Sequence, residues 1–171
     1  MLACVSFLRR FGPTYSPSLN AIYVDSIDWC TLIKLAPAGA FQRQYGTPFV
    51  GSSNGFGDSD PNHRGGWVYA IDADSGKVLW RHHSSLPMVA SLTPTAGGIV
   101  LTGDLEGNLL AFDAASGKVL LKTTGPIGGG IGTYMVAGRH YIAVASGMKN
   151  AIMQMQSGPA AVVIYALPST G

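Results

Sequence analysis

Apolar and polar residues alternate along this chain in short stretches, which glycine, proline, asparagine and aspartate residues separate. An alternation with a period of two is typical of half-buried strands, and short strands between turn residues are typical of all-β proteins. The pattern predicts two strands within 13–24, on either side of a turn from Ser16 to Asn20, and further strands at 28–35, 67–71, 77–80, 88–92, 99–102, 109–112, 133–137, 140–145 and 160–166.

One stretch of the chain occurs twice. Residues 70–80 read Ala-Ile-Asp-Ala-Asp-Ser-Gly-Lys-Val-Leu-Trp, and 41 positions later residues 111–121 read Ala-Phe-Asp-Ala-Ala-Ser-Gly-Lys-Val-Leu-Leu. Residues 72–76 predict a turn, because the aspartate and serine side chains can bond to nearby backbone amides and the glycine allows a positive φ. The residues on either side of this turn predict the two strands of a hairpin.

A repeat of about 40 residues is typical of β-propellers, in which each blade is a four-stranded antiparallel sheet. One unit of this repeat contains four predicted strands, at the region of Leu79, 88–92, 99–102 and 109–112. We therefore predict an all-β fold, a partial β-propeller of four-stranded antiparallel blades with about three blades plus a remnant.

The composition agrees with this fold class and narrows the possible functions. Charged residues make up 12% of the 171 residues, against about 25% in typical soluble domains, and glycine occurs 23 times. So few charged residues indicate that little of the chain is solvated helix surface, and the many glycines indicate many turns. The net charge is only +2, with no basic run beyond Arg9-Arg10, which disfavours nucleic acid as a partner.

The sequence predicts no membrane span and no signal peptide. No apolar run reaches the ~18 residues of a span. The positive charges of Arg9-Arg10 follow the first apolar run, whereas in a signal peptide they precede it. We expect residues 1–12 to be a non-native or disordered start and residues 13–171 to form the blades. Cys4 and Cys30 form no metal- or haem-binding motif; free thiols are favoured over a disulfide, which stays open.

A long loop is predicted at about residues 36–65, and such loops in compact domains are usually functional or capping. Within it, 58–62 begins like a calcium-binding loop, but position 6 is His63 instead of glycine and position 12 is Tyr69 instead of glutamate. A polar turn is therefore favoured there. The glycine-rich stretch 125–132 lacks the Gly-Lys-Ser/Thr end of a phosphate loop, and its glycines predict close backbone packing instead.

The repeat resembles the tryptophan-docking motif of the quinoprotein alcohol dehydrogenases, eight-bladed propellers that hold pyrroloquinoline quinone (PQQ). That motif reads Ala-x-Asp-x-x-Thr/Ser-Gly-Lys-x-x-Trp, and residues 70–80 match it at every defined place, whereas Leu121 departs from it. The resemblance implies that the indole of Trp80 docks between neighbouring blades and stacks on the peptide of a motif glycine, and that docking at Leu121 is weaker. The implied structural docking residues are Ala70, Asp72, Gly76, Trp80, Ala111, Asp113 and Gly117.

Further similarities to this family extend over about residues 12–166. They lie at 15–17, 19–24 and 28–30 before the long loop, at 95–98 and 103–107 between hairpins, and at 140–147 near the end. Their order implies the C-terminal portion of the propeller. The family's catalytic aspartate, calcium ligands and adjacent-cysteine disulfide ring lie earlier, so we expect no catalytic and no metal-binding residue in this chain.

Two places in the sequence correspond to cofactor contacts of the family. The first has Arg9-Arg10-Phe11 where the family has a polar amide side chain and a tryptophan, so this contact departs from the pattern. The second falls at Val89 and Ala90, the candidate cofactor-binding residues, for which contact with PQQ and core packing are equally open.

The resemblance implies a periplasmic PQQ-dependent alcohol dehydrogenase, in which an alcohol gives two electrons to PQQ beside a calcium or lanthanide ion and a cytochrome then accepts them. The implied partners are the remaining blades, a small alcohol and the cytochrome. This chain is expected to be inactive alone, because it lacks the catalytic half. The alternative is a non-catalytic propeller of PQQ-like repeats that acts as a binding or scaffold module. Open blade faces and strand edges predict self-association or aggregation.

Overall fold

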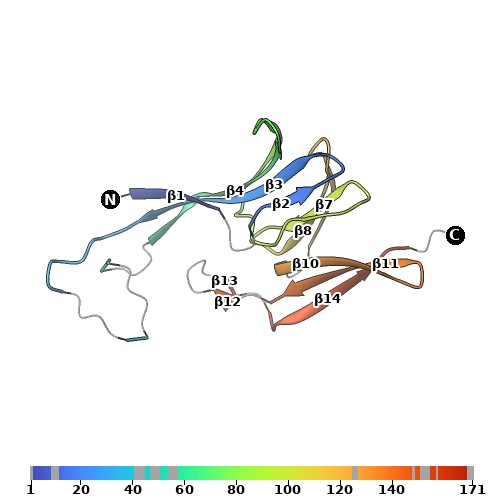
Figure 1. The fold of residues 1–171 in the computed structure, drawn as a ribbon. Coiled ribbons are helices and arrows are strands. Elements are labelled where there is room, and N and C mark those ends of the chain that lie inside the picture. The colour runs from blue at the N-terminus through green and yellow to red at the C-terminus, as the bar shows by residue number, and fades with distance from the viewer. Residues whose placement is uncertain are drawn as a thin grey trace.

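The computed structural model describes residues 2–8, 12–40, 45–46, 51–53, 58–124, 127–147, 149–150, 155–156 and 158–168. The regular elements in these ranges are strands, which pair into antiparallel sheets. In Figure 1 the first sheet lies uppermost, and the third, in orange to red, lies at the bottom. Within the described ranges, no helix is long and apolar enough to span a bilayer.

The first sheet consists of β1 (Leu2–Leu8), β2 (Thr14–Ser16), β3 (Ala21–Leu32), β4 (Asp58–Asp72) and β5 (Val78–Ser84), in the order β1-β3-β4-β5. β2 pairs with the beginning of β3, where Ser16 lies opposite Ala21, and β1 pairs with the later part, from Ser26 onward. β1 and β2 therefore share one place beside β3, and the sheet is four strands wide.

The second sheet has four strands in the order β6 (Thr93–Pro94), β7 (Ile99–Gly103), β8 (Asn108–Asp113) and β9 (Val119–Thr124). The third sheet has three, β10 (Ile127–Val136), β11 (Arg139–Ser146) and β14 (Ala161–Ala166), and the short strands β12 (Lys149–Asn150) and β13 (Met155–Gln156) pair with each other. This succession of antiparallel sheets is a partial β-propeller, which confirms the fold class predicted from the repeat.

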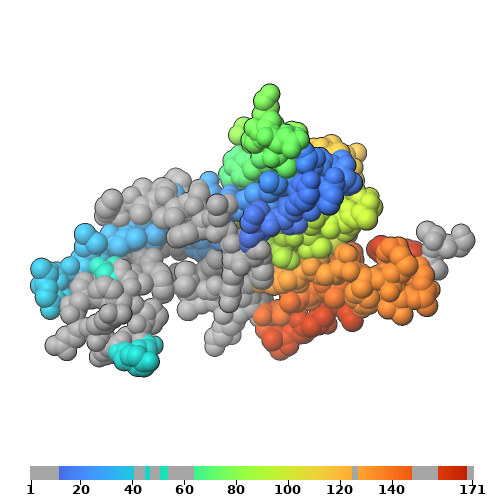
Figure 2. Space-filling model, viewed as in Figure 1, coloured from blue at the N-terminus to red at the C-terminus, as the bar shows by residue number. Residues whose placement is uncertain are grey.

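Two apolar layers hold the three sheets together, because successive side chains of a strand point to opposite faces. Figure 2 shows the sheets stacked directly on one another. The first layer joins the first and second sheets and consists of Ala21, Tyr23, Val68, Ala70, Met88, Leu92, Val100, Leu110, Phe112 and Ala114, with Trp80 packed against it. The second layer joins the second and third sheets and consists of Ala90, Leu101, Leu109, Ala111, Ile127, Ile131 and Val144, with Ile99, Ile142 and Tyr165 packed against it.

The boundaries of the sequence repeat do not coincide with the boundaries of the sheets, so the predicted set of four strands in one blade is wrong. The strand around Leu79 is β5, the last strand of the first sheet, although the repeat unit predicts it as a member of the next blade. The fourth strand of the second sheet is β9 instead. One repeat unit thus begins in one sheet and ends in the next. Periodicity defines the length of a unit, but not the point at which the chain passes between sheets.

Two predicted elements before the repeat differ in the structure. β3 continues without a break to Leu32, so the separate strand predicted at 28–35 is wrong. Residues 58–62 belong to β4 instead of forming a polar turn. The β3–β4 pairing passes from Trp29 opposite Arg64 to Thr31 opposite Ser59, so 60–63 form a bulge. A bulge explains how β4 accommodates Pro61, which cannot donate to a regular ladder.

Two later elements also differ from the prediction. The strand predicted at 88–92 is an irregular segment, in which Met88 forms an isolated bridge with Asp104, and a strand follows only at β6. The strands predicted at 133–137 and 140–145 are joined by a turn at Ala137 and Gly138, which both have a positive φ, so the first strand ends and the second begins one residue earlier. These two residues form the two-residue turn that matches the twist of paired strands.

The beginning of the chain contains regular structure that the sequence did not predict. β1 pairs with β3 from Leu2 to Leu8. Cys30 is disulfide-bonded, and Cys4, the one other cysteine of the sequence, is its register partner. The preference for free thiols is therefore wrong, because strand pairing brings together two cysteines that their spacing alone does not connect. Arg9-Arg10-Phe11 lies outside the described residues.

The glycine-rich stretch has close packing at one of its described glycines. A Cβ on Gly129 would lie 2.8 Å from the Cβ of Ala145, whereas a Cβ on Gly130 or Gly132 would meet no described atom within 4 Å. Residues 125–126, 148, 151–154 and 157 lie outside the described ranges.

Candidate functional site

The two repeat turns are built in the same way. Asp72 Oδ1 accepts hydrogen bonds from the backbone amide of Ser75 at 2.8 Å and from its hydroxyl at 2.6 Å. Asp113 Oδ1 accepts the same two bonds from Ser116, at 2.8 Å and 2.7 Å. These hydrogen bonds hold the pKa of both aspartates below its usual range, because they stabilise the carboxylate. Each carboxylate therefore fixes the turn that presents the motif glycine.

Trp80 of the first sheet lies across Gly117 of the second. A Cβ on Gly117 would come within 2.5 Å of Trp80 Cδ2 and 2.6 Å of Cε3, so only glycine leaves room for the ring. The indole Nε1 donates a hydrogen bond to the carbonyl oxygen of Ala114 at 2.9 Å. The tryptophan thus covers the turn of the second sheet with its ring while its polar nitrogen has an acceptor.

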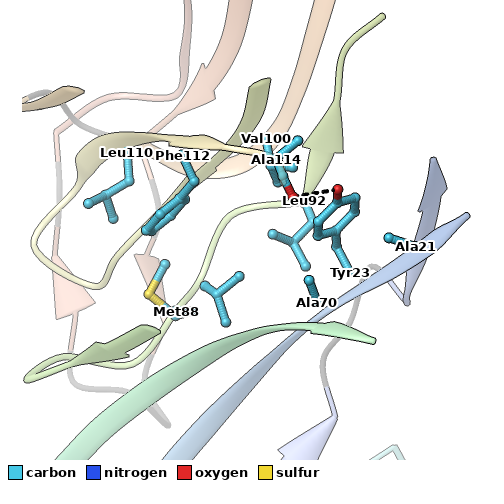
Figure 3. Packing of buried hydrophobic residues seen from close by; sticks show 10 residues of the cluster. Ala21, Tyr23, Ala70, Met88, Leu92, Val100, Leu110, Phe112 and Ala114 are labelled. Carbon is cyan, nitrogen blue, oxygen red and sulfur yellow. Dashed lines mark hydrogen bonds between the residues drawn. The ribbon is translucent and has the colours of Figure 1, made fainter. Parts of the chain in front are cut away.

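The carbonyl of Ala114 accepts a second hydrogen bond, from the hydroxyl of Tyr23 at 2.9 Å. Figure 3 shows this bond beside the apolar residues that surround it. The Tyr23 ring is fully buried, 5.8 Å from the Trp80 ring, and Phe112 stacks on Trp80 at 6.0 Å. Burial and, secondarily, the charge of Asp113 raise the pKa of Tyr23, which keeps the hydroxyl a neutral donor. Two donors of the first sheet therefore converge on one carbonyl of the second.

A β-bulge in β5 sets the direction of Trp80. Ala70 lies opposite Trp80 and Ile71 lies opposite Val78, so Leu79 is the additional residue. Ala70 is fully buried in the first apolar layer, against which Trp80 packs. The bulge therefore lets Trp80 and Ala70 share the face that points to the second sheet, while Leu79 is 52% exposed.

The second copy of the motif has the same bulge but lacks the indole. Ala111 lies opposite Leu121 and Phe112 opposite Val119, so Leu120 is the additional residue. Ala111 is buried in the second apolar layer. Leu121 is 48% exposed, and the third sheet carries no further copy of the motif in sequence. The outer strand of the second sheet therefore buries far less of its docking residue than that of the first.

Gly76 has the backbone conformation of Gly117 but a different environment. Both glycines have a φ of +71°. A Cβ on Gly76 would meet no atom of the described residues within 4 Å, in contrast to the ring that covers Gly117. The first motif thus presents an exposed copy of the surface that receives Trp80 in the second motif.

Val89 and Ala90, the candidate cofactor-binding residues, lie in the protein interior. Both are fully buried. Their backbone amides donate hydrogen bonds to the carbonyl oxygen of Gly103, at 2.8 Å and 3.1 Å respectively. A Cβ on Gly103 would lie 3.1 Å from that of Ala90, so the two segments are in close contact. This arrangement supports core packing, one of the two alternatives that the sequence left open.

The buried carboxylate of Asp104 has a structural role in the turn between β7 and β8. Its oxygens accept hydrogen bonds from the backbone amides of Glu106 and Asn108, both at 3.1 Å, and from Asn108 Nδ2 at 2.8 Å, while Lys122 Nζ lies 3.9 Å away. These bonds close the turn between β7 and β8. Where side chains are described, no group of three or more His, Cys, Asp or Glu residues could hold a metal ion.

Sequence reasoning did not identify Tyr23, Ala114 and His82 as members of the docking site. His82 lies on β5 with its ring edge-on to Phe112 at 4.8 Å. Burial, and then the charges of His83 and Lys122, lower its pKa, so the imidazole stays neutral at neutral pH. The alternation within 21–24 signals that Tyr23 is buried, but these residues meet their partners only when the sheets stack.

Comparisons with known proteins place the chain among PQQ-related sequences. The family model described as "Outer membrane protein assembly factor BamB" matches residues 64–158. The quinoprotein ethanol dehydrogenase of Pseudomonas aeruginosa is 41% identical over 91 residues, which are 51% of this chain and 14% of that protein. The lanthanide-dependent methanol dehydrogenase of Methylorubrum extorquens is 35% identical over 139 residues, which are 78% of this chain and 22% of that protein.

The fold also matches a solved structure. The quinohemoprotein alcohol dehydrogenase ADHIIG from Pseudomonas putida aligns with a TM-score of 0.71 at 19% identity, over 93% of this chain and 26% of that one. At this identity the match supports the fold alone. The chain thus spans about a quarter or less of the relatives it matches.

Proposed function

Because the chain belongs to the PQQ-repeat family and, within it, to the quinoprotein alcohol dehydrogenases, we propose that it is the C-terminal part of the propeller of such an enzyme. The whole enzyme would oxidise a small alcohol with PQQ in the periplasm and pass the electrons to a cytochrome. The observation that carries this proposal is the docking of Trp80 on Gly117 between two stacked sheets, the contact that the family's motif implies. The relatives support the reaction class, since one is named as an ethanol dehydrogenase and the other as a methanol dehydrogenase.

The free face of the first sheet supports a further blade before it. In the second sheet, Leu110 and Phe112 are buried under the first sheet. The residues 41 positions earlier are Tyr69 and Ile71, which lie opposite Val24 and Ile22 on the face of the first sheet that points away from the second. An apolar face of this kind, with Gly76 exposed beside it, fits a preceding blade that packs as the first sheet packs on the second.

The third sheet also has an apolar face that points away from the second. Tyr134 lies opposite Tyr141, and the two rings stack at 5.3 Å. On the same face Ile164 is 56% and Val162 is 68% exposed. Two apolar faces on opposite sides of the stack, on which no described strand lies, fit a chain that forms an internal part of a larger ring.

The described residues do not fit a complete cofactor site. Val89 and Ala90 are buried, and their amides are used within the chain. Because the described side chains also offer no cluster for a metal ion, we derive no catalytic step for this chain. We propose instead that PQQ and its calcium or lanthanide ion bind to other blades of the parent enzyme, and that this chain contributes rigid blades to the ring.

A second candidate is a non-catalytic propeller of PQQ-like repeats that serves as a binding or scaffold module. One observation favours it: the matching family model is described by an outer-membrane assembly factor. The two candidates differ in cofactor chemistry, since only the dehydrogenase requires PQQ.

The length and cofactor content of the native polypeptide test the proposal. We expect a mass of three to four times the 17.8 kDa of this chain, because the 139 aligned residues are 22% of the methanol dehydrogenase, which makes that protein about 3.7 times as long as this chain. The native protein should show quinone absorbance and dye-linked alcohol oxidation, whereas this chain with added PQQ and calcium should show neither. Turnover by the chain alone would contradict the proposal, and a full-length propeller without quinone would favour the scaffold.

A further inference from the structure

One end of the first sheet is narrower than the rest. β5 pairs with β4 only as far as Gly66, and β2 pairs with β3 only as far as Tyr23. Beyond these points the strands that the structure describes in this sheet are β1, β3 and β4. We call this part the ribbon, and it consists of residues 2–6 of β1, 28–32 of β3 and 58–65 of β4. Figure 1 shows the ribbon leading away from the stacked sheets toward the connection between β3 and β4.

β1 makes the ribbon three-stranded at the place where the pairing of the other two strands is interrupted. The register of β3 with β4 passes from Trp29 opposite Arg64 to Thr31 opposite Ser59, so the interruption falls at Cys30. The register of β1 with β3 has no shift along the whole of β1. A two-stranded antiparallel ribbon is marginally stable in water, and a third strand stabilises it. The ribbon therefore depends on β1 most strongly at Cys30.

The disulfide lies at this same position. Cys30 is disulfide-bonded, and Cys4, the one other cysteine of the sequence, is its register partner on β1. The Cys30 side chain is buried. Beside it, the guanidinium of Arg64 lies 4.9 Å from the centroid of the Trp29 ring, a cation–π contact between β4 and β3. The disulfide thus joins the third strand to β3 where the bulge weakens the β3–β4 ladder.

The ribbon is also the base of the long connection at residues 33–57. β3 ends at Leu32, which lies opposite Asp58 at the beginning of β4. Within the connection, Leu35 forms an isolated antiparallel bridge with Ser52, so the pairing of the ribbon continues beyond the two strands. The order of the ribbon therefore determines where the connection lies relative to the stacked sheets.

From this arrangement we propose that oxidation of Cys4 and Cys30 orders the ribbon and thereby fixes the position of the connection. The two thiols lose two protons and two electrons to a disulfide oxidant, which is reduced to a dithiol, and the new S–S bond joins β1 to β3. In the reduced chain only the ladder holds β1, an edge strand, and its loss leaves an interrupted two-stranded ribbon. The ribbon is thus ordered in an oxidising compartment and loose in a reducing one. The proposal does not depend on the enzyme assignment.

Hydrogen exchange measured by mass spectrometry tests the proposal on the native polypeptide. One sample is oxidised with glutathione disulfide and the other is reduced with dithiothreitol. In the reduced sample, the backbone amides of 28–32 and 58–65 should exchange about tenfold faster or more, because local opening becomes easier. The amides of β7 and β8 should exchange at the same rate in both samples. Peptide mapping of the oxidised sample should show Cys4 linked to Cys30.

Cys4→Ala is the matched control, because it removes the disulfide and leaves the buried Cys30 in place. This variant should exchange like the reduced protein and should not respond to dithiothreitol. Equal exchange of the ribbon in the two samples would overturn the proposal. So would an equal acceleration in β7 and β8, since the disulfide would then stabilise the protein as a whole. A response of Cys4→Ala to dithiothreitol would likewise overturn it, since another disulfide would then order the ribbon.

Discussion

The hydrogen bonds between neighbouring sheets lie at different places in the two junctions of this molecule. Between the first and second sheets, Trp80 and Tyr23 both donate to Ala114, so this junction has a polar contact at the outer strand β5 as well as an apolar layer. Between the second and third sheets, the hydrogen bonds lie near β6 and β10: Thr93 Oγ1 donates to the carbonyl of Ile131 at 2.8 Å, and the Ile131 amide donates to Ser91 Oγ at 2.8 Å.

This difference shows what the docking motif adds to a blade. Both copies have the same turn and the same bulge, so local structure does not distinguish them. One side chain does: an indole at position 80 reaches a glycine of the next sheet, whereas Leu121 stays half exposed. The same local hairpin can therefore either contact the next sheet at its outer strand, as with Trp80, or leave that contact unmade, as with Leu121.

Removal of the indole should have the largest effect. Trp80→Ala deletes the ring over Gly117 and leaves the first apolar layer uncovered at one side, so we expect the free energy of unfolding to fall by about 3–5 kcal/mol. Leu121→Ala at the equivalent place should cost less than about 1 kcal/mol, because that side chain is 48% exposed. Urea unfolding at equal protein concentration measures both, and equal losses would remove the distinction between the copies.

The shared carbonyl of Ala114 should give a smaller, non-additive effect. Tyr23→Phe and Trp80→Phe each remove one donor to this oxygen, and we expect Tyr23→Phe to cost about 1 kcal/mol. Since either donor alone can satisfy the buried carbonyl, the double variant should lose more than the sum of the two single losses. A double-mutant cycle measures this coupling, and strict additivity would mean that the two hydrogen bonds act independently.

Acid should weaken the first junction in a pH range that His82 defines. Its pKa is lowered in the folded state, so the unfolded chain binds the proton more readily, and stability should fall as the pH drops below the ordinary value of 6.5. The lowered pKa values of Asp72 and Asp113 cause a loss of stability only at lower pH, below the ordinary value of 3.8. His82→Gln should flatten the stability profile between pH 8 and 5. An unchanged profile in His82→Gln would assign the acid response to other groups.

The smallest effect should come from giving the second copy its missing indole. Leu121→Trp restores the motif sequence, but the third sheet offers no motif glycine for the ring to cover. We expect a change in the free energy of unfolding within about 0.5 kcal/mol, as for an exposed substitution. A clear gain in stability would mean that the ring finds a docking surface elsewhere on the third sheet.

The sequence revealed the local part of the docking site but not its distant partners. The turn of Asp72, Ser75 and Gly76 was predictable, because its hydrogen bonds lie within five residues. The acceptor at Ala114 and the donor at Tyr23 were not, since they lie 91 residues apart in the chain and meet only through stacking. The docking of Trp80 on a glycine was predicted from the family resemblance, because no local sequence pattern indicates this contact.

The fold shows the same division between local and non-local information. Alternation and turn residues predicted most hairpins correctly, as at β4–β5 and β8–β9. They failed at 88–92, where a largely buried segment bonds irregularly to Gly103, and at the cysteines, which strand pairing brings together. The passage of the chain between sheets was misplaced by one strand, because a repeat has no intrinsic beginning.

A comparison of Gly117→Ala with Gly76→Ala tests the central claim most directly. Both glycines have a φ of +71°, so both substitutions carry the same backbone cost of about 1–2 kcal/mol. Only at Gly117 does the new methyl group meet the indole, within 2.6 Å of Trp80 Cδ2 and Cε3. If Trp80 docks there, Gly117→Ala should lower the free energy of unfolding by a further 1–3 kcal/mol, approximately the cost of overpacking. Equal losses in the two variants would contradict the docking of the first sheet on the second.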